Sequence, residues 1–369
     1  MCTVYRERLP DSVCSSACDH PLSGFLQQRP AVVCTMESAQ GHESVLRQAL
    51  WRCVCLAGTA GDQGRHLGAL RAESCQDNLR QALIVNVVVT GASSAIGRFL
   101  LPKLLSAGHD VIAISRRPRA GNDGVIWLEA DLSEGEWPDA GSPAVLIHLA
   151  PIWLLKDFLE TALAAGLERV IAISSTSLFT KTDSVTAQER AITRLLASGE
   201  DCLRASCEQN NVPWVLFRPT LIYGAGLDKN ISSIARIVES WGVFIMPGKG
   251  DGLRQPVHAE DIAAACLAAL QGGDNRAFNL SGGSTIPYTA MVEQIFKVLG
   301  KPVRIIHLPA WLVKGMVPAI RLLPRFRHLT LGMLQRIETD LCFDHREAAE
   351  ALDYAPRAFL QNGRSDLGL

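Results

Sequence analysis

The chain has 369 residues, of which 48% are hydrophobic and 20% are charged, and its formal net charge is −1 at pH 7. This composition is typical of a globular protein with a large core. The balanced charge provides no overall field that would attract nucleic acid. No uninterrupted apolar run reaches the about 18 residues that a membrane span requires. We therefore expect a cytoplasmic protein with neither a nucleic-acid partner nor a transmembrane span.

Residues 1–83 differ in character from the rest of the chain. They hold seven of the eleven cysteines and show neither sustained hydrophobic periodicity nor a secretory signal pattern. A metal module built from Cys14, Cys18, His20 and Cys34 is disfavoured, because their spacing does not form paired CxxC knuckles. We therefore predict a disordered extension, or sequence upstream of a true start near residues 83–87, and no bound metal.

The most informative segment is NVVVTGASSAIG at residues 86–97. A run of β-branched residues ends in a small turn at Gly91, and a helical pattern follows at 97–107. This order lets main-chain N–H groups and a helix N-terminus face a pyrophosphate, and a Cβ at Gly91 would obstruct that approach. The predicted cofactor contacts here are Thr90, Gly91, Ser93, Ser94, Ala95, Ile96 and Gly97.

Strand and helix patterns alternate along the rest of the chain. The alternation predicts an α/β fold: a doubly wound parallel sheet of Rossmann type with helices on both faces. Residues 84–225 then form the cofactor-binding core, and residues 226–369 form a smaller mixed region over the ligand crevice. The predicted strands are residues 85–90, 111–115, 125–128, 144–149, 170–174 and 215–218, and the later helices are 152–166, 187–210, 260–271 and 288–299.

Ser115, Arg116 and Arg117 follow the second predicted strand. An acidic residue at this point would accept hydrogen bonds from the adenosine ribose, whereas guanidinium groups match a 2′-phosphate in geometry and charge. We therefore expect NADP(H) in preference to NAD(H), with a solvated basic strand end as the alternative. Asp131, at the end of the third strand, could bond the adenine amino group or act as an ordinary turn residue.

Seven short segments follow one another in an order typical of one family. They are TGASSAIG at 90–97, GHDV at 108–111, HLA at 148–150, SSTS at 174–177, RPTLIYG at 218–224, RQPVHAEDIA at 254–263 and YAPR at 354–357. From residue 84 to about residue 360 the chain thus resembles an extended or atypical short-chain dehydrogenase/reductase of the NAD-dependent epimerase/dehydratase type. The resemblance implies a Rossmann fold and a nicotinamide dinucleotide cofactor.

The resemblance also implies roles for individual residues. Thr176, with Ser175 beside it, matches the segment that supplies the active-site hydroxyl. Arg254 stands where sugar-nucleotide members of the family contact the substrate diphosphate, and Lys249 could reinforce it. An isolated Arg in a Gly-rich loop would otherwise be exposed and neutral in effect. The further cofactor contacts that the resemblance implies are Leu132, Leu149, Ala150 and Pro219.

The chain departs from the family pattern in two places. Ser94 or Ala95 replaces the middle glycine of the turn, which adds bulk beside the pyrophosphate. The family's catalytic Tyr and Lys lie one helical turn apart, and the Lys ammonium lowers the pKa of the phenol for proton transfer. Counting back from Glu200 puts these two positions at Ile192 and Leu196, and neither side chain can titrate.

Substitutes for this dyad are few. The hydroxyl of Thr176 is a poor base at pH 7. Glu189 or Arg194 could act from the same predicted helix, although both also fit the surface of an ordinary amphipathic helix. Lys181 is the only lysine between Thr176 and the RPTLIYG segment, and His148 is better explained as a structural histidine or a cofactor contact.

Two functions remain open at this point. The first is an NADP(H)-dependent enzyme that epimerises or reduces a hydroxyl-bearing small molecule such as a sugar nucleotide. The second is a non-catalytic NADP(H)-binding accessory, sensor or assembly protein, similar to the nucleotide-binding accessory subunit of respiratory complex I. The apolar stretch 308–318 predicts either a helix pair over the crevice or a surface for a partner or peripheral membrane contact. A homodimer is a further open arrangement.

Overall fold

The structure is a computed structural model. It describes residues 85–369 apart from 120–123, 136, 182–185, 229, 310, 314 and 316–335. The predicted N-terminal extension and the disfavoured cysteine–histidine metal module therefore lie outside the described residues. Part of the apolar stretch 308–318 lies outside them as well.

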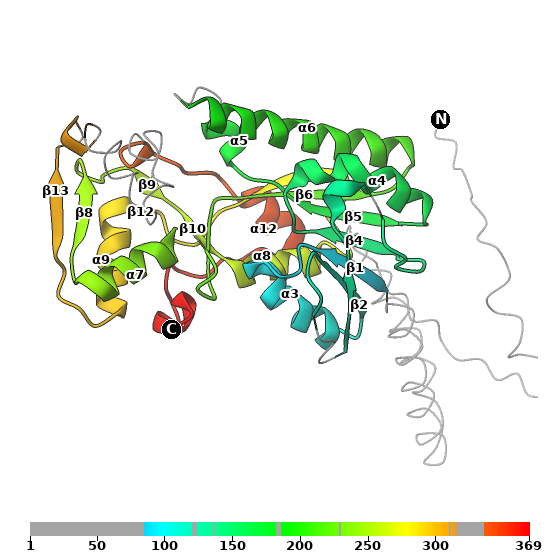
Figure 1. The fold of residues 1–369 in the computed structure, drawn as a ribbon, viewed down its shortest axis with the longest axis horizontal. Helices are drawn as coiled ribbons and strands as arrows, with labels where there is room; N and C mark the ends of the chain where they lie inside the picture. Colours follow the sequence, from blue (N-terminus) through cyan, green and yellow to red (C-terminus); the bar gives the residue numbers. More distant parts are fainter. Residues whose placement is uncertain are drawn as a thin grey trace, which may run out of the picture. The chain divides into compact units, whose positions relative to one another are not determined.

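A seven-stranded parallel sheet forms the larger part of the described fold (Figure 1). Its strand order is β11-β6-β5-β4-β1-β2-β3, so the order of the strands reverses between β1 and β4. Ligands of open α/β sheets bind in the crevice at such a reversal, beyond the carboxyl ends of the strands. The predicted Rossmann-type α/β fold is confirmed. The strands are β1 Asn86–Thr90, β2 Asp110–Ser115, β3 Val125–Glu129, β4 Val145–His148, β5 Arg169–Ile173, β6 Trp214–Pro219 and β11 Arg276–Leu280.

Helices cover both faces of this sheet because its strands are apolar on both sides. Val87 and Val89 of β1 face one core, which α3 (Ala95–Ser106), α8 (Ala259–Ala268) and α12 (Arg346–Leu352) complete. Val88 faces the opposite core, which α4 (Leu155–Ala164) and α6 (Ala187–Gln209) complete. The alternation of side chains along a strand thus assigns each helix to its face.

Two local features fix how the helices begin and pack. Ser94 caps α3 by accepting a hydrogen bond from the Gly97 N–H at 3.2 Å, so the helix starts two residues before its predicted start. Gly199 of α6 lies directly against the main chain of Ile152, where an added Cβ would come within 2.8 Å of a backbone carbon. A glycine is therefore what lets α6 approach the short helix η2 (Ile152–Leu154).

In the described residues, the smaller region combines the helices α7 (Ile231–Trp241) and α9 (Tyr288–Val298) with three two-stranded sheets (Figure 1). Tyr223, Met246, Phe296 and Phe359 lie in its separate apolar core. The chain does not stay in this region after residue 226, because α8, β11 and α12 return to the large sheet. Of its elements, the sequence pattern predicted α9 and none of the others. Besides α7 and α9, the elements are β7 Leu221–Tyr223 with β10 Pro256–His258, β8 Phe244–Pro247 with β13 Ile305–Leu308, β9 Leu253–Arg254 with β12 Ile286–Pro287, and η4 Gly363–Leu367.

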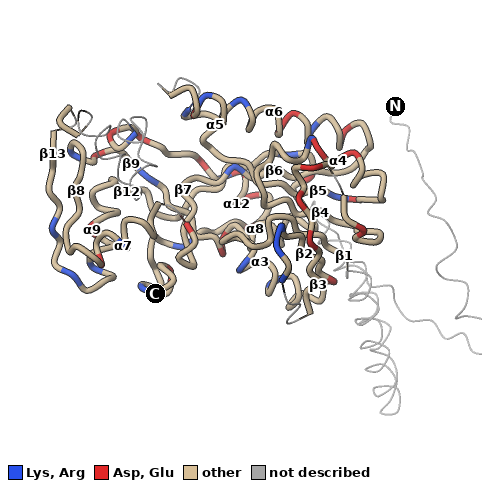
Figure 2. Tube along the Cα trace, in the orientation of Figure 1, with Lys and Arg blue, Asp and Glu red and all other residues tan. Residues whose placement is uncertain are grey.

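Basic and acidic residues are interspersed along the tube of the described chain, most visibly on α6 (Figure 2). This mixture agrees with the near-zero net charge and gives the helix no face of a single sign. Among the described residues, no helix combines the length and the apolar character that crossing a membrane requires.

Candidate cofactor and substrate site

The turn after β1 brings two main-chain segments into close contact at the strand-order reversal. Gly91 has φ +65°, and a Cβ there would lie 2.5 Å from the Ala150 nitrogen, which follows β4. A Cβ at Gly97 would collide with the Ala92 carbonyl oxygen. The sequence pattern predicts that Gly91 leaves room for a pyrophosphate. The structure gives a nearer reason for the glycine, which is the left-handed backbone and the packing on Ala150.

Ser94, one of the two residues expected at the family's middle-glycine position, shows no backbone strain. Its φ is −70° and its ψ is 169°, which any residue adopts, and its hydroxyl serves as the cap of α3. Ser93 is exposed, whereas Ser94 and Ala95 are half-buried, so these three present the outer side of the turn. Ile96 is buried in the core, so only its main chain is available to a ligand.

The residues after β2 and β3 form the adjoining part of the site. The Ser115 hydroxyl donates to the Arg117 carbonyl oxygen at 3.1 Å and accepts from the Arg117 N–H at 3.4 Å. This double contact holds the turn that exposes Arg116 and Arg117. Asp131 accepts from the hydroxyl and the N–H of Ser133, which lowers the pKa of its carboxyl, with a smaller contribution from the Arg116 charge.

Thr90 and His148 face each other across β1 and β4. The His148 Nε2 lies 3.2 Å from the Pro151 carbonyl oxygen, which can only accept, so Nε2 carries the hydrogen. Nδ1 therefore accepts from the Thr90 hydroxyl at 2.7 Å. Burial lowers the pKa of His148 to about 4, so the ring is neutral at pH 7. The Thr90 hydroxyl is thus used inside the protein, and the whole residue is buried.

The remaining predicted cofactor contacts lie at the carboxyl ends of three strands of the large sheet. Leu132 and Leu149 are buried, and Ala150 is half-buried beside Gly91. Pro219 is buried at the end of β6, and its carbonyl oxygen accepts from the Thr176 N–H and hydroxyl. These residues thus lie after β3, after β4 and at the end of β6.

Thr176 and Ser175, the predicted catalytic pair, follow β5. The Thr176 hydroxyl is buried and donates to the Pro219 carbonyl oxygen at 3.1 Å. The Ser175 hydroxyl is half-buried and accepts from the Ser177 N–H at 3.1 Å, where the short helix α5 (Ser177–Thr180) begins. Both hydroxyls are therefore fixed in place by the protein itself.

A buried charge network supports this segment from behind. Ser174 donates to the Glu200 Oε1 at 2.5 Å, and the Arg218 guanidinium contacts both Glu200 carboxylate oxygens, with Nη2–Oε2 at 2.5 Å. Glu200 is on α6, Arg218 is on β6, and Ser174 directly follows β5. The network therefore joins α6 and β6 to the end of β5. Arg218 and Glu200 therefore act structurally in positions that the sequence motifs had singled out.

The two positions that the resemblance assigns to the catalytic dyad hold core residues. Leu196 is buried in the core between α6 and α4, and Ile192 packs against the same core. Arg194, considered as a substitute, is exposed on the other side of α6.

Glu189, the other substitute, is buried and forms a two-pronged ion pair with Arg336. Lys181 lies in the field of both charges. Burial lowers the pKa of Lys181 first, the Arg336 charge lowers it further, and Glu189 opposes the shift. Arg336 belongs to no sequence motif and lies far from Glu189 along the chain, so this ion pair could not be predicted.

Arg254 is not an exposed loop residue, which corrects the simpler expectation for it. It is only 5% exposed, and its guanidinium donates to the carbonyl oxygens of Leu253, Thr339 and Arg336. Lys249, expected to reinforce it, is exposed, and its N–H donates to the Glu338 carboxylate at 2.9 Å.

The closing YAPR segment has a structural role. The Arg357 guanidinium donates to Asp261 at 2.7 Å and to Glu260 at 2.8 Å, and the Tyr354 hydroxyl donates to the Ser281 carbonyl oxygen at 3.0 Å. These bonds tie the end of the chain to the start of α8 and to the end of β11.

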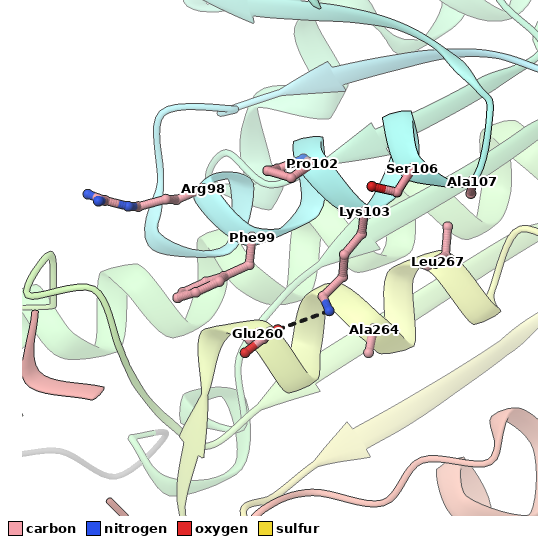
Figure 3. A pocket seen from close by; sticks show the side chains of 9 residues that line it. All are labelled: Arg98, Phe99, Pro102, Lys103, Ser106, Ala107, Glu260, Ala264 and Leu267. Carbon is pink, nitrogen blue, oxygen red and sulfur yellow. Dashed lines mark ion pairs between the residues drawn. The ribbon is translucent and has the colours of Figure 1, made fainter. Parts of the chain in front are cut away.

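A shallow groove between α3 and α8 is separate from the predicted site (Figure 3). Lys103 of α3 reaches across it to the Glu260 carboxylate of α8 at 3.0 Å. The groove shares no residue with the predicted cofactor or substrate contacts.

Comparison with known proteins agrees with this geometry. Residues 87–281 match the model of the NAD dependent epimerase/dehydratase family. The (4-alkanoyl-5-oxo-2,5-dihydrofuran-3-yl)methyl phosphate reductase of Streptomyces griseus is 28% identical over 230 residues, which cover 59% of this chain and 75% of the reductase. The chain is 25% identical over 224 residues to an uncharacterized protein of Mycobacterium tuberculosis and spans 24% of that protein's length.

Solved structures of other proteins share this fold, as the following example shows. The UDP-glucuronic acid 4-epimerase of Bacillus cereus, in complex with UDP-glucuronic acid and NAD, superposes with a TM-score of 0.59 at 17% identity. The match covers 77% of this chain and 98% of the epimerase. At this level of identity the likeness concerns the fold alone.

Proposed function

The chain belongs to the NAD-dependent epimerase/dehydratase family, and from that premise we propose that it is an NADP(H)-dependent oxidoreductase of hydroxyl- or carbonyl-bearing small molecules. Reductases and epimerases both occur among its relatives and structural neighbours. The proposal includes the preference for NADP(H) and a non-standard active site without the Tyr–Lys dyad.

The observation that carries the proposal is the turn between β1 and α3 at the strand-order reversal, where open α/β sheets bind ligands in a crevice. Gly91 packs on Ala150 there, and the half-buried Ser94 and Ala95 lie at the N-terminus of α3, where the Ser94 hydroxyl caps the Gly97 N–H. Helix N-termini bind phosphate groups through free N–H groups and the helix dipole. Arg116 and Arg117 project from the next strand end, where a 2′-phosphate would be recognised. The residues present therefore fit a dinucleotide, with its pyrophosphate at α3.

The hydroxyls of Ser175 and Thr176 support a positioning role beside that crevice. When bound, the nicotinamide would supply or accept the hydride. Ser175 accepts from the Ser177 N–H, which leaves its own hydrogen for a substrate oxygen. Thr176 donates to Pro219, which leaves an oxygen lone pair that can accept from a substrate hydroxyl. A carbonyl oxygen that becomes a hydroxyl on reduction could thus be held at both stages, with the proton coming from water.

The test is transfer of deuterium from NADPH labelled at the reacting carbon. The protein is incubated with the labelled cofactor and with panels of sugar nucleotides, ketones, aldehydes and enones, and products are analysed by mass spectrometry. We expect one panel to gain deuterium, and Thr176→Val to lower the rate about tenfold to a hundredfold, as for loss of a positioned hydrogen-bonding group. Thr176→Ser should retain most of the rate, and Ser106→Ala, in the groove between α3 and α8, should retain all of it. Tight NADPH binding without transfer to any panel would overturn the proposal.

A non-catalytic NADP(H)-binding protein is the second candidate. It is favoured by the burial of Leu196 in the core, at the position where the family carries its Lys. A purified chain that binds NADPH, transfers no deuterium and co-purifies with one protein partner would support it over the enzyme.

A further inference from the structure

Arg254 is the residue whose environment departs most from what a substrate-phosphate contact requires. Its Nη1 donates to the carbonyl oxygens of Leu253 and Thr339, each at 2.7 Å, and its Nη2 donates to the carbonyl oxygen of Arg336. The guanidinium also lies 5.5 Å from the ring centroid of Tyr288. A guanidinium needs several acceptors once it leaves water. The protein's own main chain provides them here.

Two of the three carbonyls belong to residues 336–343, which we call the strap. Its main chain runs beside β9: the Leu341 N–H donates to the Leu253 carbonyl oxygen at 3.0 Å, and the Gly252 N–H donates to the Ile337 carbonyl oxygen at 3.2 Å. The Asp340 carboxylate accepts from the Leu253 N–H at 2.8 Å. The strap is thus hydrogen-bonded to β9 like an added strand.

The packing under the strap leaves no room for a side chain. A Cβ at Gly252 would come within 2.6 Å of the Ile337 carbonyl oxygen and 2.8 Å of the Thr339 nitrogen. The main chains therefore lie directly on each other, with Arg254 enclosed beside them. Such packing is typical of a permanent part of a fold rather than of a loop resting on it.

The strap's own cation does not replace Arg254 as an anion ligand. Arg336 points its guanidinium at α6, where both prongs contact the Glu189 carboxylate at 2.7 and 2.8 Å. The pair is largely buried, so its charges neutralise each other. The Arg254 guanidinium is therefore surrounded by the negative ends of carbonyl dipoles. These carbonyl oxygens would repel a phosphate group at this place.

We infer that the strap closes the diphosphate subsite, and that the substrate is a hydroxyl or carbonyl compound without a nucleoside diphosphate. In this chain Arg254 is a positioning residue that holds the strap. Binding a diphosphate would require three carbonyl groups to leave the guanidinium and the strap to leave β9. The inference rests on the proposed function for the reaction, and it narrows the substrate class of the same site.

The direct test is calorimetric titration of the full chain, saturated with NADP+, with UDP, dTDP and UDP-glucose. Saturating cofactor is required because a free nucleotide could otherwise enter the dinucleotide crevice. We expect no saturable heat up to millimolar ligand. Saturable binding of any of the three ligands at micromolar concentration would overturn the inference. Failure of NADP+ itself to bind would instead count against the proposed function, and the two failures are therefore distinguishable.

The variants Arg254→Lys and Arg254→Met test the positioning role without any substrate. If the Arg254 guanidinium holds the strap, both variants should melt at a clearly lower temperature than the wild type in the absence of ligand. The ammonium of Lys cannot reproduce the fork that reaches three carbonyl oxygens, and Met has no donor at all. The matched control is Arg304→Met, an exposed residue of the same region, which should melt like the wild type. Unchanged melting of both Arg254 variants would contradict the positioning role. If neither variant folds, the titration of the wild type still decides the substrate class.

Discussion

Glu189 and Arg336 join α6 to the strap through two parallel hydrogen bonds, Nη1–Oε2 at 2.7 Å and Nη2–Oε1 at 2.8 Å. Glu189 lies in the first turn of α6, and Arg336 begins the strap that encloses Arg254. Both side chains are largely buried. The pair therefore links the large sheet's covering helix to the smaller region at the edge of the proposed active site.

Replacing Glu189 by Gln should destabilise the protein strongly. The change leaves the Arg336 charge largely buried without its carboxylate, and breaking one partner of a buried ion pair costs about 3–5 kcal/mol. The free energy of unfolding from urea denaturation measures the effect. The control is Glu208→Gln at the exposed end of the same helix, which should change it by less than about 0.5 kcal/mol. Equal effects of the two substitutions would show that the ion pair contributes little.

The parts of the fold that the sequence predicted are those with local causes. The β-branched run before Gly91 and the helix after it depend on residues within one short segment, and the predicted strands of the large sheet coincide with the observed ones to within a residue or two. The turn could be identified because only glycine adopts a left-handed backbone freely while leaving space for Ala150.

The surroundings of Arg254 could not be predicted, because its partners are distant in sequence. The strap carbonyls belong to residues 82 and 85 positions further along the chain, and carbonyl groups leave no mark in a sequence. Arg336 meets Glu189 across 147 positions for the same reason. The resemblance could suggest a phosphate contact at Arg254, whereas only the packing of the strap on Gly252 shows what the guanidinium actually contacts.

Introducing the family's lysine at Leu196 should destabilise the protein, so the Tyr–Lys dyad cannot be restored by substitution at this position without a loss of stability. Leu196→Lys would place an ammonium in the core between α6 and α4, and we expect a loss of about 3 kcal/mol or more in the free energy of unfolding. Its neighbour Leu195 is 38% exposed, so Leu195→Lys should cost less than about 1 kcal/mol. Urea denaturation of both variants measures the difference. A fully stable Leu196→Lys protein would mean that this side chain can reach the crevice after all.

Arg116 and Arg117 should determine the choice of cofactor. The double substitution Arg116→Ala/Arg117→Ala removes the two guanidinium groups of the turn that Ser115 holds. We expect NADPH affinity to fall about a hundredfold or more, since each charge-assisted contact contributes about 1.5–3 kcal/mol. NADH affinity should stay the same. Fluorescence titration with both cofactors at one fixed salt concentration gives the ratio, because salt screens such contacts. The control is Arg204→Ala on the exposed face of α6. A parallel loss of NADH binding would show that the pair does not recognise the 2′-phosphate.

His148 should make the protein less stable in mild acid. Burial lowers its pKa from the usual 6.5 to about 4 in the folded state, so the unfolded chain binds a proton between these values and the folded chain does not. Stability therefore falls as the pH drops from 6.5 towards 4, by about 3 kcal/mol in total for this one group. The neutral ring is also what accepts from Thr90, so protonation would remove that bond. His148→Asn keeps a donor and an acceptor but does not titrate. Its free energy of unfolding should consequently change less steeply with pH across this range than that of the wild type, although its stability at pH 7 is lower. Parallel slopes for the two proteins would mean that acid destabilisation arises from other groups.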